Sequence, residues 1–143
     1  MSCYRLSGTA IPVEDIIEST DHIHLDPIPR VVAESRRFVA EHAPGISTSL
    51  REVLLLLTSE LVTNAVIHAR TALEVGVTVT DNSVVVTVHD EDLGPAEPDA
   101  AREGGWGLGL VSSLSDASDL ERHPGDGKTA WFRITRDDKE PAA

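Results

Sequence analysis

The sequence lacks several features that would place it in other classes of protein. Its single cysteine, Cys3, cannot form a disulfide within the chain. No apolar run approaches the roughly eighteen residues that a membrane-spanning helix needs. The opening stretch MSCYRLSGTA has neither the apolar segment nor the small-residue cleavage site of a signal peptide. We therefore expect a soluble, cytoplasmic protein with no membrane partner.

Basic residues are also scarce. The chain has 12 Lys and Arg against 24 Asp and Glu, which gives a formal net charge of -12. Non-specific nucleic-acid binding depends on clustered Lys and Arg, so a charge of this sign argues against a direct nucleic-acid partner. A basic protein partner is compatible with it, although the charge is equally well explained by solubility alone.

The length and composition predict one domain. A chain of 143 residues with 41% hydrophobic residues suits a single hydrophobic core. We expect an N-terminal arm over residues 1–20, a folded domain over residues 21–136 and a frayed tail over residues 137–143. The arm can be either frayed or an added strand.

Hydrophobic periodicity predicts helices in the first half of the folded domain. After a short strand at HIHLDP, residues 29–42 read as an amphipathic helix. A second helix is expected to begin at Ser47 or Ser49 and to run through His68. Capping by Ser49 would place Glu52 at the N3 position of a capping box.

The second half alternates strands with turns. LEVGVTVT and VVVTVHD, joined by a polar turn at residues 81–83, read as a hairpin. A short helix is expected over residues 107–115, and KTAWFRIT reads as a final strand. The predicted fold is α+β, a two-layer sandwich with helices on one face of a mainly antiparallel sheet.

The stretch SELVTNAVIHA places polar residues within an apolar helix face. Glu60, Asn64 and His68 lie four residues apart, so they form one stripe beside several Leu and Val. A carboxylate there is costly to desolvate unless it has partners or borders a wet cleft. A helix rotated from the expected orientation would instead expose the stripe to water, and periodicity leaves both alternatives open.

In the stretch VVVTVHDEDLGP, a hydrophobic strand ends directly in acidic residues. Asp90 at a pocket mouth can accept a hydrogen bond from an exocyclic amine such as that of adenine, and Gly94 would let the ring approach the backbone. An acidic strand end is also common in ordinary turns.

The stretch GGWGLGL, residues 104–110, contains four glycines before a predicted helix. Unobstructed backbone N–H groups at a helix start favour phosphate binding. The stretch is not the dinucleotide fingerprint, because it follows a hairpin and not a first strand. Taken alone, it is equally typical of a flexible connection.

Together these motifs, with Gly127-Lys128-Thr129 before the last strand, resemble one family in order and spacing. It is the ATP-binding fold shared by gyrase, the heat-shock chaperones, histidine kinases and the mismatch-repair ATPases. SELVTNAVIHA, GWGLGLV and GKTAWF look most like the bacterial anti-sigma regulatory factors with serine/threonine kinase-type domains. The resemblance spans about Arg30 to Ile134.

The resemblance implies ATP and Mg²⁺ as cofactors and a role for each matching residue. Asn64 would be the Mg²⁺ ligand, and Glu60 would be the general base toward a partner's hydroxyl. Asp90 would bind the adenine amine above Gly94, although Asp92-x-Gly94 is a rival alignment. The phosphates and the lid hinge are implied at Gly105, Gly107, Leu108, Gly109 and Thr129, with Arg102 and Lys128 as candidate phosphate contacts.

The resemblance therefore predicts an ATP-dependent protein serine/threonine kinase that holds a sigma factor inactive and phosphorylates an antagonist protein. The alternative is a nucleotide-sensing or degenerate partner-binding module without phosphoryl transfer. A histidine-kinase catalytic fragment is a third possibility, which the absence of room for a phosphoacceptor hairpin disfavours. Relatives in this family often pair, so a homodimer is possible.

Overall fold

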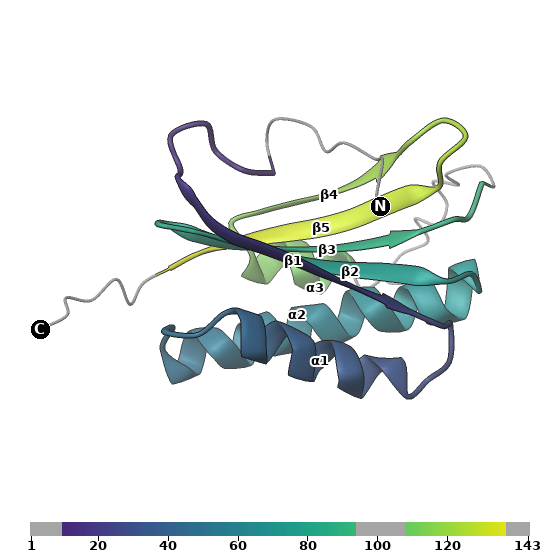
Figure 1. Ribbon diagram of the computed structural model, residues 1–143, viewed down its shortest axis with the longest axis horizontal. Helices are drawn as coiled ribbons and strands as arrows, with labels where there is room; N and C mark the ends of the chain where they lie inside the picture. Colours follow the sequence, from purple (N-terminus) through teal and green to yellow (C-terminus); the bar gives the residue numbers. More distant parts are fainter. Residues whose placement is uncertain (1–9, 94–107, 137–143) are drawn as a thin grey trace, which may run out of the picture.

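A single antiparallel sheet organises the part of the chain that the computed structural model describes, residues 10–93 and 108–136 (Figure 1). Its strands follow the order β1-β2-β3-β5-β4. Their bounds are β1 Ile17–Leu25, β2 Leu73–Thr80, β3 Ser83–Asp90, β4 Ala117–Arg122 and β5 Lys128–Thr135.

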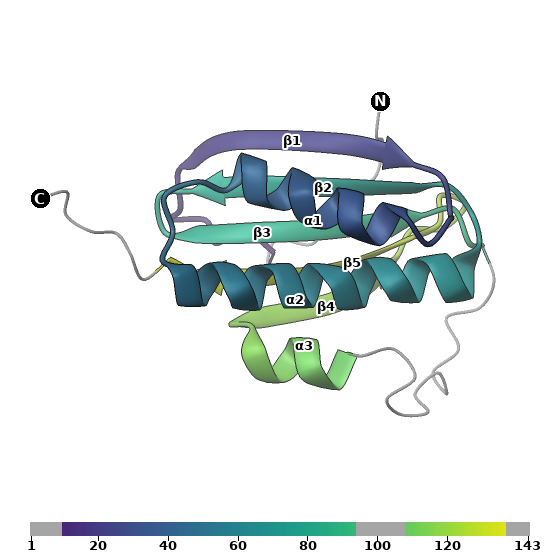
Figure 2. The same cartoon turned by 90° about the horizontal axis from the view of Figure 1, so that it is seen from below.

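The helices lie together on one face of this sheet, as Figure 2 shows from below. They are α1 Val31–His42, α2 Thr48–Asn64, the π-helix η1 Ala65–Ala69 and α3 Leu108–Leu114. Helix α2 lies between α1 and α3 and contacts both. The expected α+β sandwich with an antiparallel sheet is therefore confirmed.

The main core fills the space between the two layers. Strands β2 and β3 are rich in β-branched valine, which suits a pleated sheet, and alternate valines such as Val75, Val77, Val86 and Val88 face the helices. Leu54, Leu57 and Leu61 of α2 recur at three- and four-residue spacing and are buried against them.

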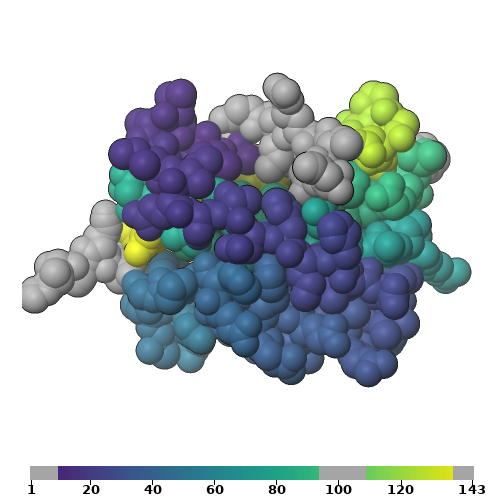
Figure 3. Space-filling model, viewed as in Figure 1, coloured from purple at the N-terminus to yellow at the C-terminus, as the bar shows by residue number. Residues whose placement is uncertain are grey.

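The sheet extends further at both edges than the sequence predicts. Strand β1 begins at Ile17, so residues 17–20 of the expected N-terminal arm lengthen the strand predicted at HIHLDP. Ala10, still earlier, is buried against Val85 and Trp131 on the face opposite the helices. The N-terminal segment, coloured purple, and β1 form part of the surface above the helices (Figure 3). At the other edge, β4 was not predicted at all.

Two details of the second helix also differ from the prediction. The Ser47 hydroxyl accepts a hydrogen bond from the Leu50 backbone N–H at 3.2 Å, so Ser47 is the N-cap. The capping box with Glu52 is therefore wrong, because it required Ser49 at that position. The α-helix also ends at Asn64 and continues as η1, which closes at Arg70 in the left-handed conformation (φ 57°).

Among the described residues, no helix is both long and apolar enough to cross a membrane.

Candidate functional site

A small pocket lies between the end of α2 and the sheet, where β3 ends. Its volume is about 20 Å³, which is room for a water molecule but not for a purine ring. The helix side contributes Leu61, Asn64 and Ala65, and the sheet side contributes Val88, Asp90, Leu120, Lys128 and Ala130. Two residues predicted from the sequence as ligands, Asn64 and Asp90, therefore share one pocket.

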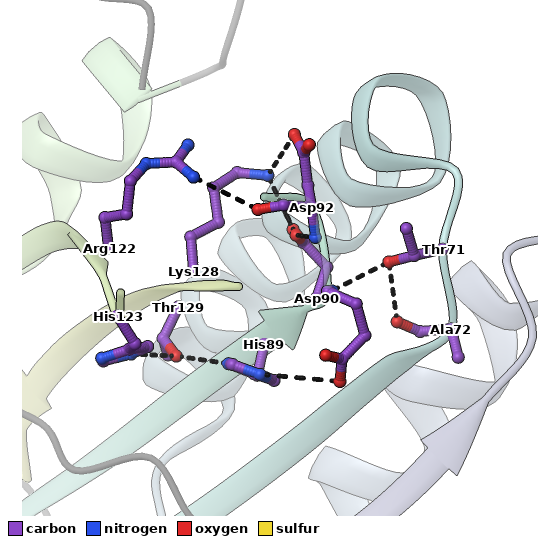
Figure 4. A network of polar contacts seen from close by, with 10 residues as sticks. Thr71, Ala72, His89, Asp90, Asp92, Arg122, His123, Lys128 and Thr129 are labelled. Carbon is purple, nitrogen blue, oxygen red and sulfur yellow. Dashed lines mark hydrogen bonds and ion pairs between the residues drawn. The ribbon is translucent and has the colours of Figure 1, made fainter. Parts of the chain in front are cut away.

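A buried ion pair occupies the sheet side of this pocket. The Lys128 ammonium donates to both carboxylate oxygens of Asp90, at 3.0 and 2.9 Å (Figure 4). Each of the two residues is only 3% exposed. The pair forms because Asp90 and Lys128 are directly opposite each other in the β3–β5 register. Lys128, considered from the sequence as a phosphate contact, thus binds the carboxylate expected to read adenine.

Asp92, the rival for that role, lies at the rim of the same cluster. Its backbone N–H donates to Asp90 Oδ1 at 2.9 Å, and its own carboxylate is 3.3 Å from Lys128 Nζ. The Arg122 guanidinium donates to its carbonyl oxygen at 3.2 Å. Asp90 is the buried carboxylate of the two and lines the pocket, whereas the Asp92 side chain is 35% exposed.

Asn64 carries an unusual polar group for a helix-packing position. Its Nδ2 is buried and has no hydrogen-bond partner among the described residues. A buried, unpaired amide costs free energy comparable to a lost hydrogen bond. Such groups in native proteins therefore generally have a functional role or a bound partner. Asn64 is also the last residue of α2 before the π-helix, a feature that often occurs at functional sites.

The predicted stripe on α2 is only partly preserved. Glu60 lies one turn before Asn64 and is half-buried, whereas His68 is exposed. The wider π-helical turn at residues 65–69 breaks the 100° spacing that would have kept His68 in line. The end of the stripe is therefore turned away from the pocket.

Thr129, predicted as a nucleotide contact, lies on the face of the sheet opposite the pocket. Neighbouring residues of a strand point to opposite faces, so Lys128 enters the pocket and Thr129 points away from the helices. Its hydroxyl bonds His89 Nδ1 at 2.8 Å and His123 Nε2 at 2.9 Å (Figure 4). We therefore do not assign Thr129 to a ligand in this pocket.

The remaining predicted residues belong to the segment before α3. Gly94, Arg102, Gly105 and Gly107 lie outside the described residues. Leu108 and Gly109 begin α3, and a side chain at Gly109 would meet nothing within 4 Å. Sequence reasoning missed Leu120 and Arg122 near the site, since β4 has no run of buried apolar residues to reveal it.

Gly127 lies in the turn before β5 and thereby positions Lys128 opposite Asp90. Its φ is +78°, and a Cβ there would overlap the carbonyl oxygen of Asp90 and lie 2.9 Å from Glu91 Cα. Gly125, in the same turn, has nearly the same φ, +76°, but a Cβ there meets nothing within 4 Å. The two glycines thus share a backbone conformation and differ in the space available.

We expect Gly127→Ala to lower the free energy of unfolding by about 2–5 kcal/mol, from left-handed strain plus the overlap. Gly125→Ala is the matched control and should cost only the strain, about 1 kcal/mol. Urea unfolding of both variants measures the difference. Equal losses would show that the contact between Gly127 and Asp90 does not constrain the turn.

A two-layer sandwich with helices on one face of an antiparallel sheet is consistent with the histidine kinase-like ATPase fold. The sequence pattern described as the histidine kinase-like ATPase domain matches residues 26–134, and the chain belongs to this family. No curated protein matches the chain.

One solved structure is similar to the chain over most of its length. The crystal structure of the RsbU and RsbW domains of Rv1364c from Mycobacterium tuberculosis is 25% identical, with a TM-score of 0.59. The match covers 83% of this chain and 33% of that chain, so the protein described here spans about a third of the length of that relative.

The family implies ATP, usually with Mg²⁺, and two polar groups of the pocket fit parts of such a ligand. The unpaired Asn64 Nδ2 is a donor that a phosphate oxygen of a nucleotide could satisfy, and the Asp90 carboxylate is an acceptor for a nucleotide amine. Asp90 Oδ1 already accepts from Lys128 and from the Asp92 N–H, whereas Oδ2 accepts from Lys128 and keeps a second acceptor position for an adenine amine. Lys128 therefore competes with a base for the Asp90 carboxylate, and it also lines the pocket that the base would enter.

Proposed function

We propose that this protein is an ATP-binding regulatory protein serine/threonine kinase of the anti-sigma factor type. It would sequester a sigma factor and phosphorylate an antagonist protein. The observation that carries the proposal is the unpaired, buried amide of Asn64 in the same pocket as Asp90, within a histidine kinase-like ATPase domain. Similarity to a structure that contains an RsbW domain supports the regulatory assignment.

The proposed roles follow from the chemistry of the side chains. The Asn64 amide oxygen would bind Mg²⁺, and the Asp90 carboxylate would accept from the adenine amine. Glu60, one turn before Asn64, would accept the proton of the substrate hydroxyl. ATP, when bound, supplies the phosphoryl group, and the protein positions the reacting groups around it.

The ion pair supports a second candidate, a nucleotide-sensing or degenerate binding module that does not transfer phosphate. Phosphoryl transfer needs positive charge near the γ-phosphate. Lys128 is the cation among the described residues that line the pocket, and its ammonium is held by Asp90. A chain that keeps this pair in its nucleotide-bound state would bind without catalysing.

Transfer of labelled γ-phosphate from ATP to candidate antagonist proteins separates the two functions. The kinase proposal predicts a phosphorylated serine or threonine, and a roughly 10²- to 10⁴-fold slower transfer by Glu60→Gln with unchanged ATP affinity. Glu52→Gln, an exposed position on the same helix, is the matched control and should transfer normally. ATP binding without a product would favour the binding module, and normal transfer by Glu60→Gln would remove Glu60 from the mechanism.

A further inference from the structure

A second cluster of ligand-type side chains lies on the face of the sheet opposite the pocket. His89, Glu91 and Asp126 each offer one ligand atom, and these atoms all lie within 4.8 Å of one another. His89 is on β3, Glu91 follows that strand, and Asp126 belongs to the turn before β5. We propose that this His89 cluster binds a divalent transition-metal ion of the zinc class.

The donor set of the His89 cluster combines an imidazole with two carboxylates. Zinc is bound by histidine nitrogen and by aspartate or glutamate oxygen, and catalytic-type sites use three protein ligands. Imidazole also favours zinc-class ions over Mg²⁺ and Ca²⁺, which prefer oxygen alone. Two carboxylates and a neutral imidazole offset the charge of a divalent cation, in a chain whose net charge is -12.

The buried contacts of His89 hold its ring in an orientation that suits metal binding. Its side chain is only 6% exposed, and its Nδ1 bonds the fully buried hydroxyl of Thr129 at 2.8 Å. Its other nitrogen, Nε2, is on the side of Glu91, with 3.8 Å between Nε2 and Oε2. Metal-bound histidines typically have this arrangement, with one nitrogen on the metal and the other held by a hydrogen bond.

The Thr129 hydroxyl also links His89 to His123, whose Nε2 is 2.9 Å away. A hydroxyl has one proton, so it can donate to only one of the two rings. When it donates to His123, His89 donates through Nδ1, and Nε2 then carries the lone pair that faces the carboxylates.

The geometry needs only a modest contraction to reach ligand distances. Zinc–nitrogen and zinc–oxygen bonds are about 2.0–2.2 Å, so tetrahedral ligand atoms lie roughly 3.4 Å apart. Glu91 is 60% exposed, and the Asp126 side chain is partly exposed. Both carboxylates can therefore approach Nε2 from solvent while the β3–β5 ladder holds His89 in place.

Titration of Zn²⁺ into the full chain, in competition with a chromophoric chelator, tests the proposal. We expect one bound ion per chain, and at least a roughly 100-fold loss of affinity in both Glu91→Gln and His89→Gln, because each removes a direct ligand. Glu91 is exposed, so Glu91→Gln tests the site even if His89→Gln fails to fold. Thr129→Val, at a positioning residue, should weaken binding by about 10-fold.

His24→Gln is the matched control, because His24 lies 3.5 Å from the Glu74 carboxylate in a pair that has no third ligand within the part of the chain that the structure describes. It should bind Zn²⁺ as the wild type does. Absence of Zn²⁺ binding, unchanged affinity in Glu91→Gln, or equal competition by Mg²⁺ would each overturn the proposal. These results are independent of ATP binding, since the His89 cluster and the pocket lie on opposite faces of the sheet.

Discussion

Asp90→Asn is expected to lower the free energy of unfolding by about 3–5 kcal/mol and to abolish ATP binding. The loss of stability follows because the Lys128 ammonium, 3% exposed and bound to both Asp90 oxygens, would keep its charge without its main partner. The loss of binding follows because an asparagine presents a different set of donors and acceptors to the adenine amine. Urea unfolding and calorimetric titration of ATP with Mg²⁺ measure the two effects.

Lys128→Met separates these two effects. It also breaks the ion pair and should destabilise the fold, but it leaves Asp90 available to a ligand. We therefore expect Lys128→Met to bind ATP more tightly than the wild type, while Asp90→Asn does not bind. In the double variant the unfolding losses should be clearly less than additive, because each single change leaves a buried charge that the double change removes. Additive losses would show that the pair is not energetically coupled.

Asn64→Ala is expected to lose ATP–Mg²⁺ binding while raising the free energy of unfolding by about 1 kcal/mol. Its Nδ2 is buried and unpaired among the described residues, so removing it ends a desolvation cost. Alanine also has a higher helix propensity than asparagine at the end of α2. Opposite changes in stability and binding are typical of a residue kept for function.

Thr63→Ala is the matched control for this prediction. Thr63 is the neighbouring α2 residue and does not line the pocket, so its substitution should leave ATP binding unchanged. A destabilised Asn64→Ala variant that still binds ATP with wild-type affinity would show that the Asn64 side chain is structural.

The sequence was informative where patterns are local. The valines of β2 and β3 predicted their hairpin, and the periodicity of α1 and α2 predicted both helices. Strand β4 was missed because ASDLER is polar and lies at the sheet edge, held by pairing with β5 and not by its own apolar pattern. The π-helix was missed because its start leaves no signature in a sequence read at a constant period.

The candidate site was predictable only in its parts. Asn64 and Asp90 were both identified from their motifs, and the fold brings them to one pocket. The contact between Asp90 and Lys128 depends on which strand neighbours β3 and in what register, and the two residues are 38 positions apart. The same register decides that Thr129 faces the other side, where it supports His89. The long-range strand register therefore decides which residues belong to which site, and the local sequence pattern does not.

The most direct test of the account is calorimetric titration of ATP with Mg²⁺ into the wild type, Lys128→Met and Asp90→Asn side by side. We expect binding by the wild type, tighter binding by Lys128→Met and none by Asp90→Asn. Binding by Asp90→Asn with wild-type affinity, or no binding by Lys128→Met, would contradict the claim that Asp90 accepts from the adenine amine and that Lys128 competes for this carboxylate.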